Sequence, residues 1–361
     1  MVSQVADTGI SVAQQVRREV ERTVQRSQRS FDVALRRHEP EVGLTPKETL
    51  YARGTLRLYR YRPVVDEVYR VPLVLVMSLI SKPYILDLAP GQSFIEYLVQ
   101  QGFDVYMIDW GVPRPEDHVL QLEDFVLDRI PRCIEEVQKV TKEEDVSLLG
   151  YCMGGLFAIM YGAAFPEAPL KNLVTVASPV DFTGMGLMRH WADERWFDVD
   201  KLIDTVGNVP AEMIRSTLEM LRPFDRVLGY VRLWDNMWDE EYVYNWRVRY
   251  KWVMDQIPFP GEAYRQLIKD FLRGNKLMNG GMTLAGRRID PGTIRCSVLN
   301  AMAEFDHIAP YPSTRPMTSI VGSTDKQDLL VKGGHVSLIA GANAITRFWP
   351  TVNQWLSVRS V

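Results

Sequence analysis

One stretch decides the fold of this 361-residue chain: Val146-Ser147-Leu148-Leu149-Gly150-Tyr151-Cys152-Met153-Gly154-Gly155. In it, an apolar segment meets a predicted helix at the pattern Gly-x-Cys-x-Gly. This pattern is typical of a nucleophile elbow, in which a strand turns sharply into a helix and exposes a nucleophile at the turn. Side chains at Gly150 and Gly154 would crowd that turn. The alternative is a glycine-rich turn beside a buried cysteine.

Cys152 has the surroundings that a nucleophile needs. The N-terminus of the helix predicted from Gly155 to Phe165 favours a thiolate at this position. The amide of Met153 is placed to donate to an oxyanion. We therefore predict that Cys152 is a catalytic nucleophile.

Strands and helices alternate on both sides of this turn. The predicted strands cover residues 56–62, 71–80, 103–109, 146–150, 170–177, 297–302 and 329–331. The predicted helices cover residues 93–101, 122–140 with a kink or restart at Pro131, 155–165 and 342–356. Continuous apolar strands separated by helices favour an α/β fold with a mostly parallel, doubly wound sheet.

The alternation stops between residues 181 and 290, where helical, aromatic-rich segments replace it. Six of the nine tryptophans lie there: Trp191, Trp196, Trp234, Trp238, Trp246 and Trp252. We interpret this segment as an inserted cap, or lid. The predicted domains are an N-terminal helix with a linker (1–45), a core (46–180 and 291–361) and the cap (181–290).

The N-terminal region predicts one amphipathic helix over residues 10–38. Val16, Val20 and Val24 recur at steps of four, and arginines occupy its other faces. Such a helix either packs on its own domain or docks on a partner or an apolar surface. The following Thr45-Pro46-Lys47-Glu48 has the residue order of a helix start.

Composition and charge exclude several classes of protein. The formal net charge of −3 gives no global field to attract nucleic acid or an anionic membrane. The three cysteines are too few for a disulfide framework, and no motif implies a metal or redox cofactor. A secretory signal is not apparent, and the longest apolar run, 71–80, is too short to span a bilayer. These features predict a cytoplasmic protein.

An elbow nucleophile needs a histidine base, and in this kind of fold the order along the chain is nucleophile, acid, histidine. His38 and His118 precede the nucleophile, and His190 starts the predicted cap. His307 shares a loop with the candidate acids. His335 lies between the last strand and the last helix, where the fold presents its histidine. We therefore predict His335 as the base.

The acid is expected on the loop after the penultimate strand, where Glu304 and Asp306 are both available. Asp306 is preferred because it precedes Ile308-Ala309-Pro310, a stretch suited to a rigid turn. Its role would be to fix the histidine tautomer and to stabilise the imidazolium.

A cysteine in place of serine indicates acyl transfer. A thiolate that attacks a thioester forms another thioester, so the acyl group stays activated for transfer to an alcohol. The sequence therefore suggests acyl transfer from a coenzyme A thioester, although cysteine hydrolases of the same fold also exist.

At this point the sequence resembles the polyhydroxyalkanoate synthases. The resemblance rests on residues 150–155, on Glu304-Phe305-Asp306-His307-Ile308, on Gly333-Gly334-His335, on residues 83–88 and 102–111, and on the tryptophan-rich cap. It covers the chain from about residue 45 to the end. The chain resembles the short classes, III and IV, whose catalytic subunit works with a separate accessory subunit.

The resemblance implies an α/β-hydrolase fold with an inserted helical cap, and a catalytic triad of Cys152, Asp306 and His335. It also implies an oxyanion hole formed by the backbone amides of Met153 and Ile80. Asp306 would either activate the substrate hydroxyl or only orient the histidine.

Two further residues resemble positions of the family. Trp252 matches a cap tryptophan that lies near the nucleophile. Cys133 matches a second, upstream cysteine, and the alternative for it is a buried, inert thiol.

The activity that the resemblance implies is polymerisation of (R)-3-hydroxyacyl-coenzyme A, with 3-hydroxybutyryl-coenzyme A as the expected monomer, into a polyester with release of coenzyme A. The implied partners are an accessory subunit of class III or IV, a second copy of the chain joined through the cap, and the surface of a polymer granule. Nucleic acid, a membrane span and a cofactor are not implied.

Two rival functions stay open. A cysteine hydrolase resembling dienelactone hydrolases would use water instead of a hydroxyacyl group. A non-catalytic granule-associated protein would not need Cys152 at all.

Overall fold

The computed structural model describes residues 12–34 and 39–361, which belong to two compact units. One unit comprises Met1–Glu41 and Arg222–Lys251, and the other comprises Val42–Leu221 and Trp252–Val361. Residues 10, 11 and 35–38 of the predicted N-terminal helix, including His38, lie outside the described residues. Within the described ranges, no helix is both long and apolar enough to cross a bilayer.

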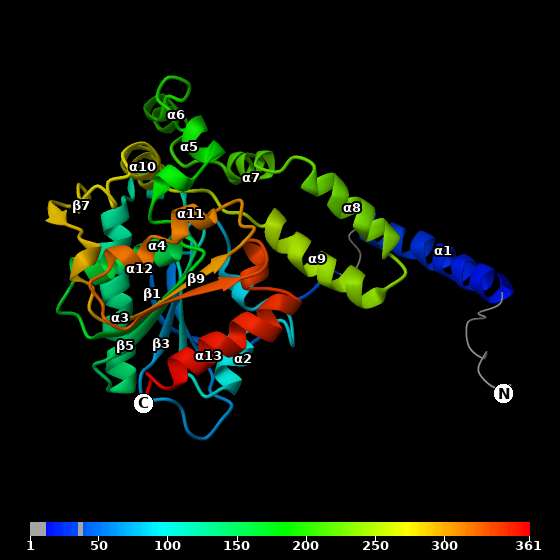
Figure 1. The fold of residues 1–361 in the computed structure, drawn as a ribbon, viewed down its shortest axis with the longest axis horizontal. Helices are drawn as coiled ribbons and strands as arrows, with labels where there is room; N and C mark the ends of the chain where they lie inside the picture. The colour runs from blue at the N-terminus through cyan, green and yellow to red at the C-terminus, as the bar shows by residue number, and fades with distance from the viewer. Residues whose placement is uncertain (1–11, 35–38) are drawn as a thin grey trace, which may run out of the picture. The chain divides into compact units, whose positions relative to one another are not determined.

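The larger unit is built on a twisted sheet (Figure 1), whose strand order among the described residues is β1-β2-β4-β3-β5-β6-β9-β10. Strands β1 and β2 are antiparallel to their neighbours, and the others run parallel. Their bounds are β1 Lys47–Arg53, β2 Leu56–Tyr61, β3 Leu73–Val76, β4 Val105–Asp109, β5 Val146–Tyr151, β6 Leu170–Val176, β9 Ser297–Ala303 and β10 Lys326–Val331. The predicted mostly parallel, doubly wound sheet is confirmed.

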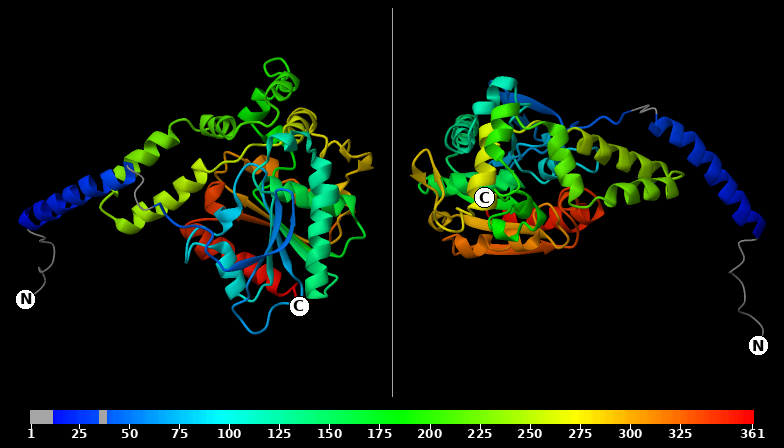
Figure 2. Two further views of the ribbon diagram at one scale, coloured as in Figure 1. Left: turned by 180° about the vertical axis from the view of Figure 1, so that it is seen from behind. Right: turned by 90° about the horizontal axis from the view of Figure 1, so that it is seen from above.

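Helices cover both faces of this sheet (Figure 2). The covering helices are α2 Phe94–Gln100, α3 Ile130–Thr141, α4 Met153–Ala164 and α13 Trp349–Ser357. Phe94 of α2 packs against Trp349 of α13, with ring centroids 5.7 Å apart. Pro131 lies in the first turn of α3, which follows a π-helical segment, Asp124–Arg129, so the predicted restart is confirmed.

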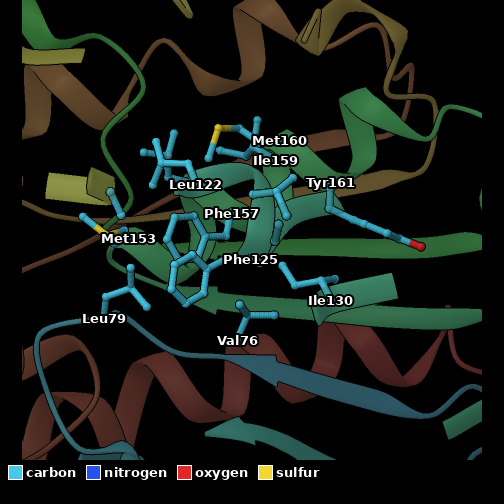
Figure 3. Packing of buried hydrophobic residues seen from close by; sticks show 14 of the residues in the cluster. Val76, Leu79, Leu122, Phe125, Ile130, Met153, Phe157, Ile159, Met160 and Tyr161 are labelled. Atoms are coloured by element: carbon cyan, nitrogen blue, oxygen red, sulfur yellow. The ribbon is translucent and has the colours of Figure 1, made fainter. Parts of the chain in front are cut away.

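The largest apolar core lies between the sheet and the face that α3 and α4 cover. Alternate residues of β3, Val74 and Val76, point into it, as the period of a strand requires. Phe125 and Phe157 stack there with centroids 5.8 Å apart and planes within 9° (Figure 3). This packing fixes α4 behind β5, at the turn where the candidate nucleophile lies.

The segment from 181 to 290 is mainly helical, as its sequence predicts. In the larger unit it contains α5 Leu187–Trp191, α6 Val199–Val206, α7 Ala211–Met220, α10 Gly261–Gln266, a π-helix over Leu267–Arg273 and a small hairpin of β7 Thr283–Leu284 with β8 Arg287–Arg288. The cap as a domain bounded at 181 and 290 stays a prediction.

Short elements complete the larger unit. They are the 3-10 helices Pro83–Leu86, Pro115–Val119, Phe182–Gly184, Pro291–Thr293 and Val336–Leu338, the helices α11 Tyr311–Thr314 and α12 Met317–Ile320, and a π-helix over Ala344–Phe348.

The smaller unit consists of α1 Val12–Ala34, α8 Asp225–Asp235 and most of α9 Glu240–Met254. Its α1 helix uses arginines to bind the turn between the other two helices. Arg22 lies over the ring of Trp238 at 4.4 Å, and Arg29 pairs with Glu240 at 3.5 Å. The valine stripe of α1 is exposed (Val16 57%, Val20 58%, Val24 51%).

Two local predictions are wrong. The segment from Thr45 to Glu48 enters strand β1 and does not start a helix. The Thr45 hydroxyl donates to the Asp87 carboxylate at 2.6 Å instead of capping a helix, so a tertiary contact outweighs the local signal. The strand predicted over residues 71–80 is limited to Leu73–Val76, because the chain leaves the sheet toward Ile80.

Candidate active site

Cys152 lies at the turn between β5 and α4, with φ 56° and ψ −124°. Non-glycine residues rarely adopt a positive φ, and such strain is concentrated at functional sites. The Cys152 amide donates to the Val176 carbonyl at 2.8 Å, which holds the turn against β6. A Cβ atom at Gly150 would overlap the backbone of Gly155, and one at Gly154 would overlap the Val76 carbonyl. The glycines of the motif are therefore required by the tight turn.

His335 and Asp306 form a buried pair. The Nδ1 atom of His335 lies 2.7 Å from Oδ2 of Asp306. The other carboxylate oxygen, Oδ1, accepts the backbone N–H groups of Ile308 and Ala309, both at 2.8 Å. Because both oxygens of Asp306 are occupied, its carboxylate is fixed in one orientation, and it holds the Nδ1 atom of the imidazole in place.

The imidazole of His335 interacts with Cys152 as well as with Asp306. Burial lowers the pKa of His335, but the negative charges of Asp306 and Cys152, and hydrogen bonds to both, outweigh burial and raise this pKa above its ordinary value. The structure thus brings Cys152, Asp306 and His335 together from three distant parts of the chain.

The other candidates lie elsewhere. The half-buried His118 is engaged through its Nδ1 atom with the Pro115 carbonyl at 2.8 Å, and His190 is exposed on α5. His307 is half-buried beside Asp306, and Glu304 is exposed. The geometry therefore favours Asp306 over Glu304 as the partner of the histidine.

Cys152 borders an apolar cavity of about 300 Å³. The residues predicted for the oxyanion hole, Ile80 and Met153, line the same cavity. Five methionines contribute to its wall: Met153, Met185, Met188, Met213 and Met220. Methionine is flexible and fills irregular space, so this wall suits apolar groups of differing shape.

The backbone of the Ile80 segment is partly engaged. Its amide faces the Ser78 hydroxyl at 3.4 Å, which is a long hydrogen bond, and its carbonyl accepts the Ile257 amide at 3.1 Å. Met153 is the first residue of α4, whose leading amides point out of the helix. An oxyanion hole formed by these two amides stays a prediction.

Trp252 is buried but is not among the residues that line this cavity. Its indole N–H donates to the Lys82 carbonyl at 3.1 Å, two residues beyond Ile80. Contact between Trp252 and substrate stays a prediction.

Of the two remaining cysteines, Cys133 is buried and Cys296 is half-buried. Burial raises the pKa of the Cys133 thiol to about 12, and does the same for Cys296. Protonated, buried thiols are poor nucleophiles. Over residues 12–34 and 39–361, no group of three histidine, cysteine, aspartate or glutamate side chains is arranged to hold a metal ion.

The sequence reasoning missed two features of the site. The methionine wall combines α5, α7 and other segments that no local motif links. The packing of Tyr151 against His335, with ring centroids 5.0 Å apart, was missed although the residue stands inside the quoted motif. The motif signals the turn, but not which way its central side chains point.

Fold and site together define a protein of the α/β-hydrolase fold with a cysteine at the turn between β5 and α4. Residues 85–342 match the family model described as the alpha/beta hydrolase fold. A monoacylglycerol lipase from Paleococcus ferrophilus is similar in structure, with a TM-score of 0.54 and 20% identity over 84% of this chain and 99% of that chain. A thermophilic esterase from Thermogutta terrifontis has a TM-score of 0.53 and 15% identity, over 88% of this chain and 100% of that chain. These likenesses show the fold.

A second family model and the sequence relatives identify a narrower family within this fold. Residues 13–98 match the model described as the poly-beta-hydroxybutyrate polymerase (PhaC) N-terminus. The poly(3-hydroxyalkanoate) polymerase subunit PhaC of Haloferax mediterranei is 36% identical to this chain, over 94% of this chain and 69% of the relative. The subunit of the same name from Allochromatium vinosum is 37% identical, over 88% of this chain and 90% of the relative. The chain belongs to the poly(3-hydroxyalkanoate) polymerase PhaC family, which confirms the resemblance found in the sequence.

Proposed function

We propose that this chain is the catalytic subunit of a polyhydroxyalkanoate synthase, which polymerises (R)-3-hydroxyacyl-coenzyme A and releases coenzyme A. The observation that carries the proposal is the Asp306–His335 pair beside Cys152, at the edge of an apolar cavity, in a member of the PhaC family. The proposed reaction is an acyl transfer, and 3-hydroxybutyryl-coenzyme A is the expected monomer.

In the first step His335 takes the proton of the Cys152 thiol, and the thiolate attacks the thioester carbonyl. The carbon–sulfur bond to coenzyme A breaks, and the departing thiolate takes a proton from His335. The amides of Met153 and Ile80 are the proposed donors to the oxyanion that forms. The product of this step is an acyl group on Cys152 and free coenzyme A.

In the second step the 3-hydroxyl of the next 3-hydroxyacyl-coenzyme A attacks the acyl-cysteine. His335 takes the hydroxyl proton, an ester bond forms, and the Cys152 thiolate leaves. The resulting thioester is one unit longer and reloads Cys152 with release of coenzyme A. Repetition of the two steps extends the polyester.

For Asp306 we propose the role of orienting His335. Its Oδ1 atom already accepts two backbone N–H groups, and its Oδ2 atom faces the imidazole. A carboxylate with both oxygens occupied and a fully buried side chain is poorly placed to take a proton from a substrate hydroxyl directly.

The partners of the enzyme are part of this proposal. An accessory subunit of the class III or IV type is the proposed partner of α1, whose exposed valine stripe offers an apolar face. A homodimer through the tryptophan-rich cap is also part of the proposal. So is a location at cytoplasmic polymer granules, because the product is insoluble. No cofactor is proposed.

The test is to incubate the purified chain with (R)-3-hydroxybutyryl-coenzyme A. A synthase releases coenzyme A and makes the solution turbid with polymer. A cysteine hydrolase would release coenzyme A and leave soluble 3-hydroxybutyrate. A granule-associated protein without catalysis would release none, and either of these two results would overturn the proposal.

A further inference from the structure

Tyr151 links the nucleophile to the base. It precedes Cys152 in the chain, and its ring packs on the imidazole of His335 with centroids 5.0 Å apart and planes tilted by 37°. Its hydroxyl donates to the backbone carbonyl of the same histidine at 3.3 Å. The side chain is almost completely buried at 1% exposure, so it has little freedom to take another position.

His335 needs such support because it lies on a loop. It precedes the short 3-10 helix Val336–Leu338 and follows Gly333, whose φ is 150°. Within the loop, the Ser337 hydroxyl accepts the Gly334 amide at 2.6 Å and donates to the Gly334 carbonyl at 2.8 Å. Asp306 holds one ring nitrogen of His335. This contact does not fix the tilt of the imidazole ring or the position of the His335 backbone, so other groups must do so.

We propose that Tyr151 is a positioning residue that holds His335 at the distance from Cys152 that proton transfer requires. Because it is bonded to Cys152 and packed on His335, it fixes the two groups relative to each other. The inference rests on the proposed function for the chemistry that the pair performs. The ionisable groups that act on His335 are Asp306 and Cys152, with Tyr151 against the ring face.

The hydroxyl of Tyr151 stays protonated and available as a donor. Burial, together with the negative charges of Cys152 and Asp306, raises the pKa of Tyr151 well above its ordinary value. A phenylalanine at this position keeps the ring but loses the hydrogen bond, whereas a leucine loses both.

The kinetic test compares Tyr151→Phe and Tyr151→Leu with Tyr106→Phe. Tyr106 is the matched control, because it is also fully buried and donates to Asp104 at 2.8 Å away from the site. In Tyr151→Phe, kcat for coenzyme A release is expected to fall on the order of five-fold with KM unchanged. In Tyr151→Leu the fall is expected to be about a hundred-fold, and in Tyr106→Phe activity is expected to stay unchanged.

A second readout does not depend on turnover. Histidine labelled with carbon-13 reports the titration of His335, assigned with a His335→Gln variant. In wild type this titration lies above that of an ordinary histidine, and in Tyr151→Leu it moves down, because the ring is no longer held against Asp306. If wild type releases no coenzyme A but this change occurs, the proposed function fails and the positioning role stands. Unchanged kcat in Tyr151→Phe together with an unchanged titration in Tyr151→Leu would overturn the positioning role.

Discussion

The carboxylate of Asp306 and the imidazole of His335 are separated by 29 positions in the chain but by 2.7 Å in the fold. This contact is buried, and the free side of the imidazole interacts with Cys152. Strands β9 and β10, which run parallel and adjacent, bring the two loops to the edge of the sheet where β5 ends. The sheet order thus assembles the site.

Replacement of Cys152 by alanine is expected to reduce coenzyme A release at least a thousand-fold, because the acyl group then has no thiolate to accept it. Cys296→Ala is the matched control and is expected to keep full activity, since that half-buried thiol lies outside the site and its pKa is raised to about 12. Both variants are compared by circular dichroism to show that they are folded. Retained polymerisation in Cys152→Ala would refute the nucleophile assignment.

Asp306→Asn is expected to lower kcat by about a thousand-fold or more, because an amide next to Nδ1 stabilises the wrong tautomer of His335. The rate of coenzyme A release measures this effect. Glu304→Gln removes an exposed carboxylate from the same loop and is expected to leave the rate unchanged. A slower release of coenzyme A by Glu304→Gln than by Asp306→Asn would contradict the assignment of Asp306 as the acid.

The stability of the protein is expected to depend on pH through His335. Its pKa is raised in the folded state, so its contribution is fully present below the ordinary histidine value of 6.5 and is lost as pH rises through the raised value. The free energy of unfolding should therefore fall between about pH 6.5 and the raised pKa of His335, about 10, by at most about 1.4 kcal/mol per pH unit.

Urea unfolding of wild type and Asp306→Asn at several pH values measures this dependence. The variant lacks the charge that raises the pKa of His335, so its pH dependence should be flatter over the same range. Parallel curves for the two proteins would show that the Asp306–His335 pair does not carry the effect.

Gly154→Ala is expected to destabilise the fold by at least about 1–3 kcal/mol, because the added methyl group overlaps the Val76 carbonyl. Gly229→Ala is the contrasting variant. Gly229 lies in helix α8 with open space around it, so its replacement by alanine is expected to raise the free energy of unfolding by up to about 1 kcal/mol. Thermal unfolding measures both, and a neutral Gly154→Ala would contradict the tight turn.

The exposed face of α1 can be tested with the triple variant Val16→Ser, Val20→Ser and Val24→Ser. Since these side chains are exposed, the free energy of unfolding is expected to change by less than about 0.5 kcal/mol per site. Copurification with an accessory subunit encoded beside this chain is expected to be lost. Val140→Ser, at an exposed valine of α3, should leave copurification intact. Copurification of the triple variant would contradict a docking role for this face.

Much of the fold follows from local sequence patterns. The apolar runs of β4, β5 and β6 predict buried parallel strands, and the helix predicted over residues 93–101 is found as α2, with Ser93 as its cap. The elbow could be predicted because Gly150 and Gly154 satisfy a steric requirement that few other residues meet. The triad positions followed from the order of elements and from the resemblance.

Other features depend on tertiary contacts that no local pattern encodes. Thr45 was expected at a helix cap, but it binds Asp87, 42 positions away, and its segment joins the sheet. The sequence places arginines on the faces of α1 other than the valine stripe but does not indicate what they contact. In the structure Arg22 lies over the ring of Trp238 and Arg29 pairs with Glu240, and the valines are exposed. In both cases the polar side chains bind distant groups, and the local periodicity gives no sign of them.

The central claim is that Cys152 carries the growing chain. The most direct measurement is mass spectrometry of peptides from the wild-type chain, quenched in acid during turnover of (R)-3-hydroxybutyryl-coenzyme A, so that the acyl-enzyme present at that moment is preserved. One or more 3-hydroxybutyryl groups are expected on the peptide that contains Cys152. Release of coenzyme A with the acyl group on another residue, or on none, would contradict it.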